Sequence, residues 1–500
     1  MGMAPVILAV SALLAARAGD YIVCVDAGGD EGYFAAGQAL ADKHSGSVIP
    51  FSRGELGQLF ERLQGEQPRF VVFVLPPAMI DVDLANDLLE RATRLDADLF
   101  TDFEYAFLTG RDARAAQAFA ERVVAAWETP RGRRGMLFAS WEGPILPSGQ
   151  PLSATRALGL DFEQAYVRVM DEEPKRREQA RPALQAMRGK DILFFMSHGY
   201  PHEMSGCYRA SDLRDWKVDL TPAILFNCAC YNGAPGRWFD IGPGGRFVDR
   251  GLVSGEDSVA LQILDSGVSA YFSGINPWHG WLTAQVLQYV VDEGCRLGEA
   301  AKRMWDRLSL EFDPGRIDFP PTAETVMRGE GFENRRRQGA GMILYGDPAW
   351  APYAATEQSR AITETQLDGA SWKVRVGFRP LLEGPPGVDY LLPQARLMNY
   401  YSVRTQDVMN ELSPEIYRRL ALPAGISSVP VLRVLTARVG EKDIPTGEVQ
   451  LVPEETRDGR FLHVRIPLAV CMAGTTWAID IAQQGIAIEL AAELKGPGGE

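Results

Sequence analysis

The chain has 500 residues, of which 46% are hydrophobic and 23% are charged, so it is too long for one compact core and too apolar to be disordered or fibrous. Its net charge of −14 makes it a poor candidate for a nucleic-acid binder, because contact with phosphates requires a basic surface. Six cysteines are too few for a disulfide scaffold of this length.

Residues 1–18 form an apolar leader in which the first charged side chain is Arg17. The leader is shorter than the roughly 20 residues that a membrane-spanning helix needs. It ends Ala16-Arg17-Ala18, which fits the small-x-small pattern of a cleaved secretory signal. We therefore predict a signal peptide at 1–18 and a secreted or periplasmic protein. The alternative is a buried first element, in which case the protein would be cytoplasmic. No other stretch is predicted to span a membrane.

Residues 19–130 predict a first α/β subdomain, because apolar strands alternate with amphipathic helices and this order favours a parallel sheet covered on both faces. Asp83 is expected to cap the N-terminus of the helix predicted at 84–95. The predicted strands lie at 21–25, 47–51 and 70–75, and the predicted helices at 33–43, 84–95 and 113–127.

Residues 131–355 predict a second α/β subdomain of the same kind, after a basic, turn-rich boundary at 129–135. A helix broken by Pro174 and Pro182 is expected within 162–187. The other predicted strands lie at 136–139, 192–196, 223–226, 268–272 and 342–345, and the other helices at 281–291 and 297–308.

Residues 365–500 differ in character, since alternating strands separated by glycine and proline turns are typical of a β-sandwich. We expect this tail to be separable from the α/β part near Tyr353.

Reactive side chains follow three strands of the second subdomain: Glu142 after the first, His198 after the second and Cys230 after the third. The loops at the carboxyl ends of parallel strands carry the sites of such sheets. If the strands are neighbours, a carboxylate, an imidazole and a thiol emerge at one edge. An imidazole converts a thiol to the nucleophilic thiolate, and a carboxylate orients the imidazole.

The two sequences Phe195-Met196-Ser197-His198-Gly199 and Phe226-Asn227-Cys228-Ala229-Cys230-Tyr231-Asn232-Gly233 resemble those of the gingipain-type cysteine peptidases, which are relatives of caspases. Four further segments resemble that family in the same order along the chain. They are Phe107 to Arg111, Ala139 to Pro144, Ser273 to Trp278, and Leu344 to Ala349 with its Gly-Asp-Pro motif. The resemblance covers roughly residues 20–355 and implies a caspase-like catalytic domain followed by an immunoglobulin-like module.

The resemblance also implies a role for each residue of the site. Cys230 would be the nucleophile and His198 the general base, with Glu142 orienting His198. The backbone N–H groups of Gly199 and Cys230 would form the oxyanion hole. Cys228 would be a packing residue. The implied substrate pocket consists of Ser273, Asn276 and Trp278. The substrate would be a protein or peptide, and no cofactor would be required.

One departure from the family concerns specificity. Arginine-specific members carry an acid soon after the Gly-Pro segment, whereas residues 145–160 hold no Asp or Glu here and the first acid is Asp161. The sequence therefore does not indicate specificity for a basic residue. Glu203, shortly after His198, could supply a charge to the pocket, but we interpret it as a solvated loop residue.

The loop after the first strand carries Asp26 and Asp30, which are separated by three residues that include two glycines. It lacks the lysine of a P-loop, so we interpret it as a tight turn or as a structural calcium site held by Asp26 and Asp30, rather than as a nucleotide site.

Two alternatives to an enzyme remain open. The first is a structural zinc site, because histidine and cysteine side chains cluster around the same motifs, although their spacing is not the paired Cys-x-x-Cys pattern. Its ligands would come from His198, His202, Cys207, Cys228 and Cys230. The second is a peptidase-like binding module without activity, because a fold does not guarantee a function.

Overall fold

The structure, a computed structural model, describes fourteen stretches of the chain, and the predicted signal at 1–18 lies outside them. They are residues 19–141, 161–168, 172–204, 207–241, 247–276, 281–311, 340–355, 361–368, 371–378, 415–423, 432–439, 442–443, 449–467 and 486–493. Within these stretches, every helix is too short or too polar to cross a bilayer.

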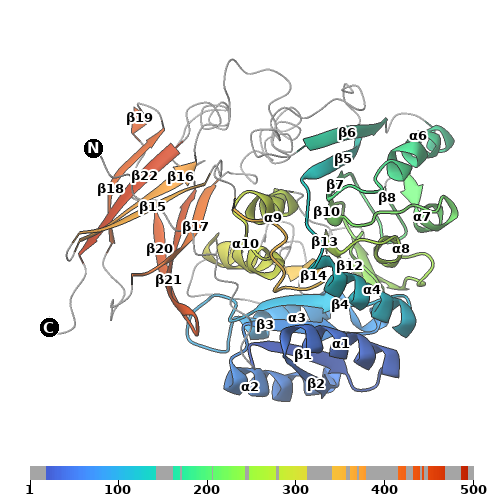
Figure 1. Cartoon of the computed structure of the whole chain (residues 1–500), viewed down its shortest axis with the longest axis horizontal. Coiled ribbons are helices and arrows are strands. Elements are labelled where there is room, and N and C mark those ends of the chain that lie inside the picture. Colours follow the sequence, from blue (N-terminus) through green and yellow to red (C-terminus); the bar gives the residue numbers. More distant parts are fainter. Residues whose placement is uncertain are drawn as a thin grey trace.

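A sheet of ten strands forms the centre of the α/β part, in the order β2-β1-β3-β4-β14-β13-β10-β7-β5-β6 (Figure 1). Six of its strands are buried at every position, as expected for apolar runs with both faces of the sheet covered: β3, β4, β7, β10, β13 and β14. The strands are β1 (Tyr21–Asp26), β2 (Ser47–Phe51), β3 (Phe70–Val74), β4 (Glu104–Leu108), β5 (Arg134–Trp141), β6 (Asp161–Arg168), β7 (Ile192–Met196), β10 (Ile224–Cys228), β13 (Ala270–Gly274) and β14 (Met342–Tyr345).

The direction of the strands reverses once within this sheet. β13 and β14 are antiparallel, whereas the other neighbouring strands are parallel. The carboxyl ends of β5, β7 and β10 therefore share one edge of the sheet. The loop after β1, which holds Asp26 and Asp30, lies at the opposite edge.

Helices cover both faces of the sheet. Figure 1 shows α9 and α10 between the sheet and the C-terminal strands, with α4, α7 and α8 on the other side. The helices are α1 (Glu31–His44), α2 (Leu56–Glu66), α3 (Val82–Ala92), α4 (Ala113–Ala126), α6 (Glu173–Gln185), α7 (Ala210–Asp215), α8 (Val259–Asp265), α9 (Trp281–Val291) and α10 (Leu297–Glu311), with short 3₁₀ turns at Arg53–Glu55 and Pro77–Met79. Two hairpins of short strands, β8 (Glu203–Met204) with β9 (Tyr208–Arg209) and β11 (Arg237–Ile241) with β12 (Phe247–Leu252), lie outside the main sheet.

Two local predictions are wrong. The region predicted as a broken helix begins as the edge strand β6, whose aromatic and β-branched residues favour a strand, and the helix starts only at α6, where Pro174 occupies the first turn. The cap of α3 is Asp81 rather than Asp83, because the Asp81 carboxylate accepts the Leu84 N–H at 2.8 Å.

The buried Asp347 carboxylate explains the Gly-Asp-Pro segment after β14 in structural terms. It accepts hydrogen bonds from the Tyr21 hydroxyl at 2.9 Å and the Trp127 indole N–H at 2.8 Å, and it pairs with His44 at 2.6 Å. These partners belong to β1, the end of α4 and α1, so Asp347 ties the segment after β14 to the N-terminal part of the same sheet and its helices.

The tail contains two antiparallel sheets among its described residues. One has five strands in the order β15-β16-β22-β18-β19, and the other has three in the order β17-β21-β20. Their strands are β15 (Ala361–Asp368), β16 (Ser371–Phe378), β17 (Glu415–Ala421), β18 (Leu432–Val439), β19 (Lys442–Asp443), β20 (Gln450–Thr456), β21 (Gly459–Pro467) and β22 (Ile486–Glu493).

Buried charges join the three-stranded sheet to α10. The Lys302 ammonium lies 2.6 Å from Asp306 on the same helix and 2.8 Å from Glu454 on β20. Glu454 also pairs with Arg419 and, at 2.8 Å, with His463. We call these five residues the interface network. Four of them are fully or almost fully buried, which a polar group tolerates only when it is well paired.

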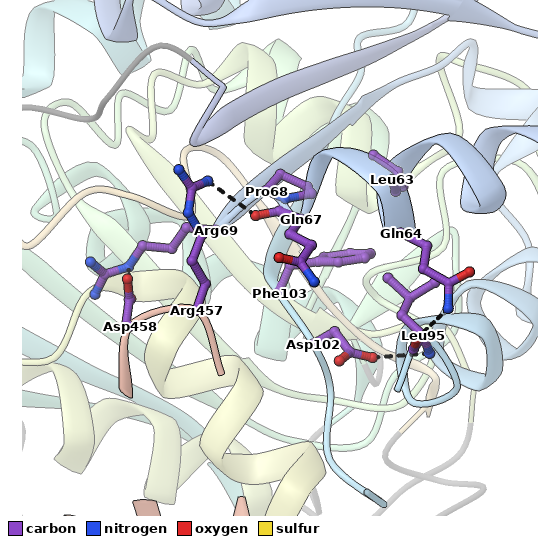
Figure 2. A pocket seen from close by; sticks show the side chains of 10 residues that line it. All are labelled: Leu63, Gln64, Gln67, Pro68, Arg69, Leu95, Asp102, Phe103, Arg457 and Asp458. Carbon is purple, nitrogen blue, oxygen red and sulfur yellow. Dashed lines mark hydrogen bonds and ion pairs between the residues drawn. The ribbon is translucent and has the colours of Figure 1, made fainter. Parts of the chain in front are cut away.

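The contact between tail and α/β part extends around this network. The Phe100 ring stacks on His463 with centroids 3.6 Å apart, and the backbone N–H and hydroxyl of Thr101 both donate to Asp306 at 2.8 Å. A small pocket of about 80 Å³ is lined by residues of both parts, among them Phe103 and Asp458 (Figure 2), and there Arg69 pairs with Asp458 at 3.1 Å. Because of these contacts, we expect that removal of the tail would expose buried side chains and destabilise the α/β part, contrary to the expectation that the tail is separable.

Candidate functional site

The strands before His198 and Cys230 are hydrogen-bonded neighbours. In the parallel pairing of β7 with β10, Met196 lies opposite Cys228. His198 and Cys230 each follow their strand's paired residue by two positions, so both leave the sheet at the same level. Because adjacent strands are about 4.8 Å apart, this register brings the imidazole-bearing and thiol-bearing loops side by side.

The strand that leads to Glu142 is the other neighbour of β7. Ala139 on β5 lies opposite Met196, and the described part of this segment ends at Trp141. Glu142 itself therefore lies outside the described residues. The expectation that the three strands are neighbours is confirmed, and the strand before His198 is the middle one.

The two loops pack closely after the strands end. A Cβ atom on Gly199 would lie 2.8 Å from the Cys230 carbonyl oxygen and 2.8 Å from the Asn232 amide nitrogen, a separation that real side chains do not tolerate. The Asn232 amide donates to the carbonyl oxygens of Tyr200 at 2.6 Å and Glu203 at 3.0 Å. Glycine at 199 and asparagine at 232 thus hold the two loops together.

The cysteines differ in accessibility. Of the five cysteines in the described part of the chain, Cys230 alone is partly exposed, and the other four, at 24, 207, 228 and 295, are buried. Burial raises the pKa of the Cys228 thiol far above its usual range, so that thiol stays protonated. This favours Cys230 over Cys228 as the reactive cysteine. His198 is exposed.

The predicted pocket residues are less accessible than the motif suggested. Ser273 lies on β13 and Asn276 follows it, and both side chains are buried. The Asn276 carbonyl accepts the Tyr231 N–H at 3.3 Å, which connects this segment to the residue after Cys230. Trp278 lies outside the described residues. Glu203, considered as a source of charge, pairs with Arg209 at 3.9 Å.

Side chains that could bind a metal ion lie close together at a place distant in the sequence from His198 and Cys230. Among the described residues, the one group of three or more His, Cys, Asp and Glu side chains with mutually close ligand atoms is Asp306, Glu454 and His463 of the interface network. The Lys302 ammonium and the Arg419 guanidinium already contact this group. The histidines and cysteines around His198 do not converge in this way, which disfavours the zinc alternative.

The loop proposed for calcium has a structural explanation in part. The Asp30 carboxylate accepts the Gly32 N–H at 2.9 Å and so caps α1. The loop belongs to the edge of the sheet opposite His198 and Cys230, so it does not contribute to their site.

Sequence reasoning assigned no role to the aromatic residues that flank the candidate pair. Tyr200 follows His198 by two positions and Tyr231 follows Cys230 directly. Trp238, on β11, packs edge-on against both tyrosine rings. In the sequence, the tyrosine directly after Cys230 could have indicated these aromatic contacts. The contact with Trp238 could not be predicted, because it depends on how the chain folds.

Comparisons with known proteins give structural likeness alone. No protein-family model and no curated protein matches the chain. The chain is similar to RgpB, a gingipain of Porphyromonas gingivalis solved with its pro-domain, at a TM-score of 0.44 and 9% identity over 71% of this chain and 86% of that one. A second solved structure, titled as a protease, has a TM-score of 0.41 and 10% identity over 72% of this chain and 84% of that one. Function is therefore argued from the side chains.

Proposed function

We propose that the chain is a cysteine endopeptidase in which Cys230 is the nucleophile and His198 the general base. The observation that carries the proposal is the shared register of the two loops, with Gly199 packed against the Cys230 carbonyl. A partly exposed thiol beside an imidazole is the arrangement that nucleophilic thiol catalysis needs. Glu142 would orient His198 from the neighbouring strand.

The chemistry follows from these roles. The Cys230 thiol transfers its proton to His198, and the sulfur attacks the carbonyl carbon of the scissile peptide bond. The N–H groups of Gly199 and Cys230 donate to the oxygen as it becomes negative. When the C–N bond breaks, the imidazolium returns the proton to the leaving amine and an acyl thioester remains. Water, deprotonated by His198, then hydrolyses the thioester and restores the thiol.

Other parts of the chain take supporting roles in this proposal. The substrate is a protein or peptide, and the reaction needs no cofactor. A calcium ion at Asp26 and Asp30 would be structural. The leader at 1–18 would direct the protein to the periplasm or the exterior. The two antiparallel sheets of the tail would form an immunoglobulin-like sandwich.

Alkylation of the native chain with iodoacetamide at pH 6 tests the thiol–imidazole pair. At this pH an ordinary thiol is about 0.3% thiolate, and an activated one is mostly thiolate. Even allowing for the weaker nucleophilicity of a low-pKa thiolate, Cys230 should react about tenfold faster than a free thiol. The rate should fall to the ordinary value in His198→Ala, as measured by mass spectrometry of the labelled peptides.

The same experiment separates the alternatives. Labelling of Cys228 before Cys230, or an unchanged rate in His198→Ala, would contradict the proposed roles. One equivalent of bound zinc, with Cys230 protected until the metal is removed, would support the zinc site instead. Slow labelling together with no cleavage of a positional-scanning peptide library would support a binding module without activity.

Gly199→Ala should lower kcat/KM for peptide hydrolysis by about 10 to 100-fold, since the added Cβ would push the His198 loop away from Cys230. Gly65→Ala on α2 is the matched control, because a Cβ there meets nothing within 4 Å. The control should keep full activity and gain up to about 1 kcal/mol of stability. Circular dichroism should show both variants folded; equal activities would mean that the close packing at Gly199 is not needed.

A further inference from the structure

Three aromatic side chains gather beside the proposed catalytic pair. The rings of Tyr200 and Tyr231 are parallel within 5°, with centroids 6.3 Å apart. Trp238 meets both edge-on, at 6.4 Å from Tyr200 and 5.4 Å from Tyr231. We call these three residues the aromatic cluster. Such offset and edge-to-face contacts are the arrangements that aromatic rings prefer.

The backbone fixes the cluster in relation to the pair. Tyr231 has φ of +60°, a left-handed conformation that is unusual for a bulky residue and points to a functional constraint. Its N–H donates to the Asn276 carbonyl at 3.3 Å, and the Asn232 amide donates to the Tyr200 carbonyl at 2.6 Å. The residues adjacent to Cys230 and His198 are thereby held in one orientation.

Exposure within the cluster is uneven. Tyr231 is buried and Trp238 is half-buried, whereas Tyr200 is 42% exposed. Tyr200 is thus one of the few large apolar side chains of the described chain that present substantial surface to solvent. Besides Tyr231 and Trp238, the His202 ring packs against Tyr200, with centroids 5.9 Å apart. The part of the Tyr200 ring that remains exposed offers burial to an apolar side chain of a bound peptide.

The charges nearby disfavour a basic partner. Aromatic faces also attract cations, but a site for lysine or arginine normally adds a carboxylate to the rings. The carboxylates of Glu203, Asp240 and Asp249 each pair with an arginine of the same hairpin. The face beside Tyr200 therefore suits an uncharged side chain.

We propose that the aromatic cluster binds an aromatic or large aliphatic side chain of the substrate next to the scissile bond. The inference rests on the proposed peptidase function for its position in the reaction. It deepens that function by naming the substrate class: peptides with a bulky apolar residue beside the bond that is cut.

The test uses peptides that differ in one residue beside the scissile bond: Phe, Leu, Ala or Arg. The Phe and Leu peptides should exceed the Ala peptide about tenfold in kcat/KM, and Tyr200→Ala should reduce this ratio to near one. Tyr200→Phe should retain it, because the ring remains. The rate of Cys230 alkylation should be the same in all three proteins, which shows that the catalytic thiol is intact.

Three outcomes would overturn the cluster's role: an equal loss for all peptides in Tyr200→Ala, a preference for Arg, or no preference. A measurement of peptide binding distinguishes failure of the peptidase proposal from failure of the proposal for the aromatic cluster. Fluorescence anisotropy of labelled peptides on the Cys230→Ala protein needs no turnover. If the Phe peptide binds more tightly but the unmodified chain hydrolyses no peptide, the role of the aromatic cluster is supported and the peptidase function is rejected. No preference in binding would reject the cluster even if hydrolysis occurs.

Discussion

Replacement of Cys230 by alanine should abolish peptide hydrolysis, with a fall in kcat of about 10⁴-fold or more and no loss of fold. The change removes the atom that forms the covalent intermediate, and loss of a nucleophile commonly costs orders of magnitude more than loss of a binding contact. Cys230 is only partly buried, so the smaller side chain leaves little cavity. The measurement is turnover of a peptide selected from the scanning library.

Cys228→Ala is the matched control, since it removes a thiol two residues away at the end of the same strand. This thiol is buried and its pKa is raised by burial, so it should contribute packing alone and most of the activity should remain. An indispensable Cys228 together with a dispensable Cys230 would show that the roles have been assigned to the wrong residue.

Most strands of the main sheet were predictable, because they are short runs of apolar residues that are largely buried. The predicted strands did not include β4, although it is fully buried. The edge strand β6 was also missed, because a strand at the edge of a sheet lacks the continuous apolar pattern. The reversal between β13 and β14 is also absent from the local sequence. Strand direction depends on how distant segments pack, and it decides which loops share an edge.

The sequence was enough to single out His198 and Cys230 as candidates, but it did not show that the two loops that carry them lie side by side. His198 and Cys230 each follow an apolar run, and only the register between β7 and β10 places them at one level. The interface network had no signal in the sequence. Lys302 lies on an amphipathic helix where a lysine is normally solvated, and its partner Glu454 is 152 residues away.

Glu454→Gln should lower the free energy of unfolding by about 3 kcal/mol at pH 7, the largest loss of stability that we expect from one substitution. Burial lowers the pKa of Lys302, but Asp306 and Glu454 raise it by more, so the ammonium stays charged inside the interface. An amide in place of the carboxylate would leave Lys302 and Arg419 short of a counter-charge in a region closed to water. Urea denaturation followed by circular dichroism measures the effect.

The neighbouring Glu455→Gln provides the control. Its side chain is 72% exposed and pairs with Arg460, whereas that of Glu454 is 1% exposed. An exposed pair contributes about 0 to 1 kcal/mol, so this variant should be close to the unmodified protein. Equal effects of the two substitutions would show that the network does not stabilise the contact between tail and α/β part.

The pH dependence gives an independent check of the same carboxylate. Burial would raise the pKa of Glu454, but Lys302 and the hydrogen bond with His463 hold it well below its usual range. A carboxyl whose pKa is lower in the folded state stabilises the fold above its unfolded-state pKa of about 4.3, and loses this contribution as the pH falls. The difference in the free energy of unfolding between Glu454→Gln and the unmodified protein should therefore narrow from pH 7 to pH 3.

A chain that ends after Tyr353 would leave Lys302 and Phe100 without their partners in the tail, Glu454 and His463. We expect this shortened chain to aggregate at neutral pH, which light scattering would measure. A soluble, monomeric product would show that the tail is separable.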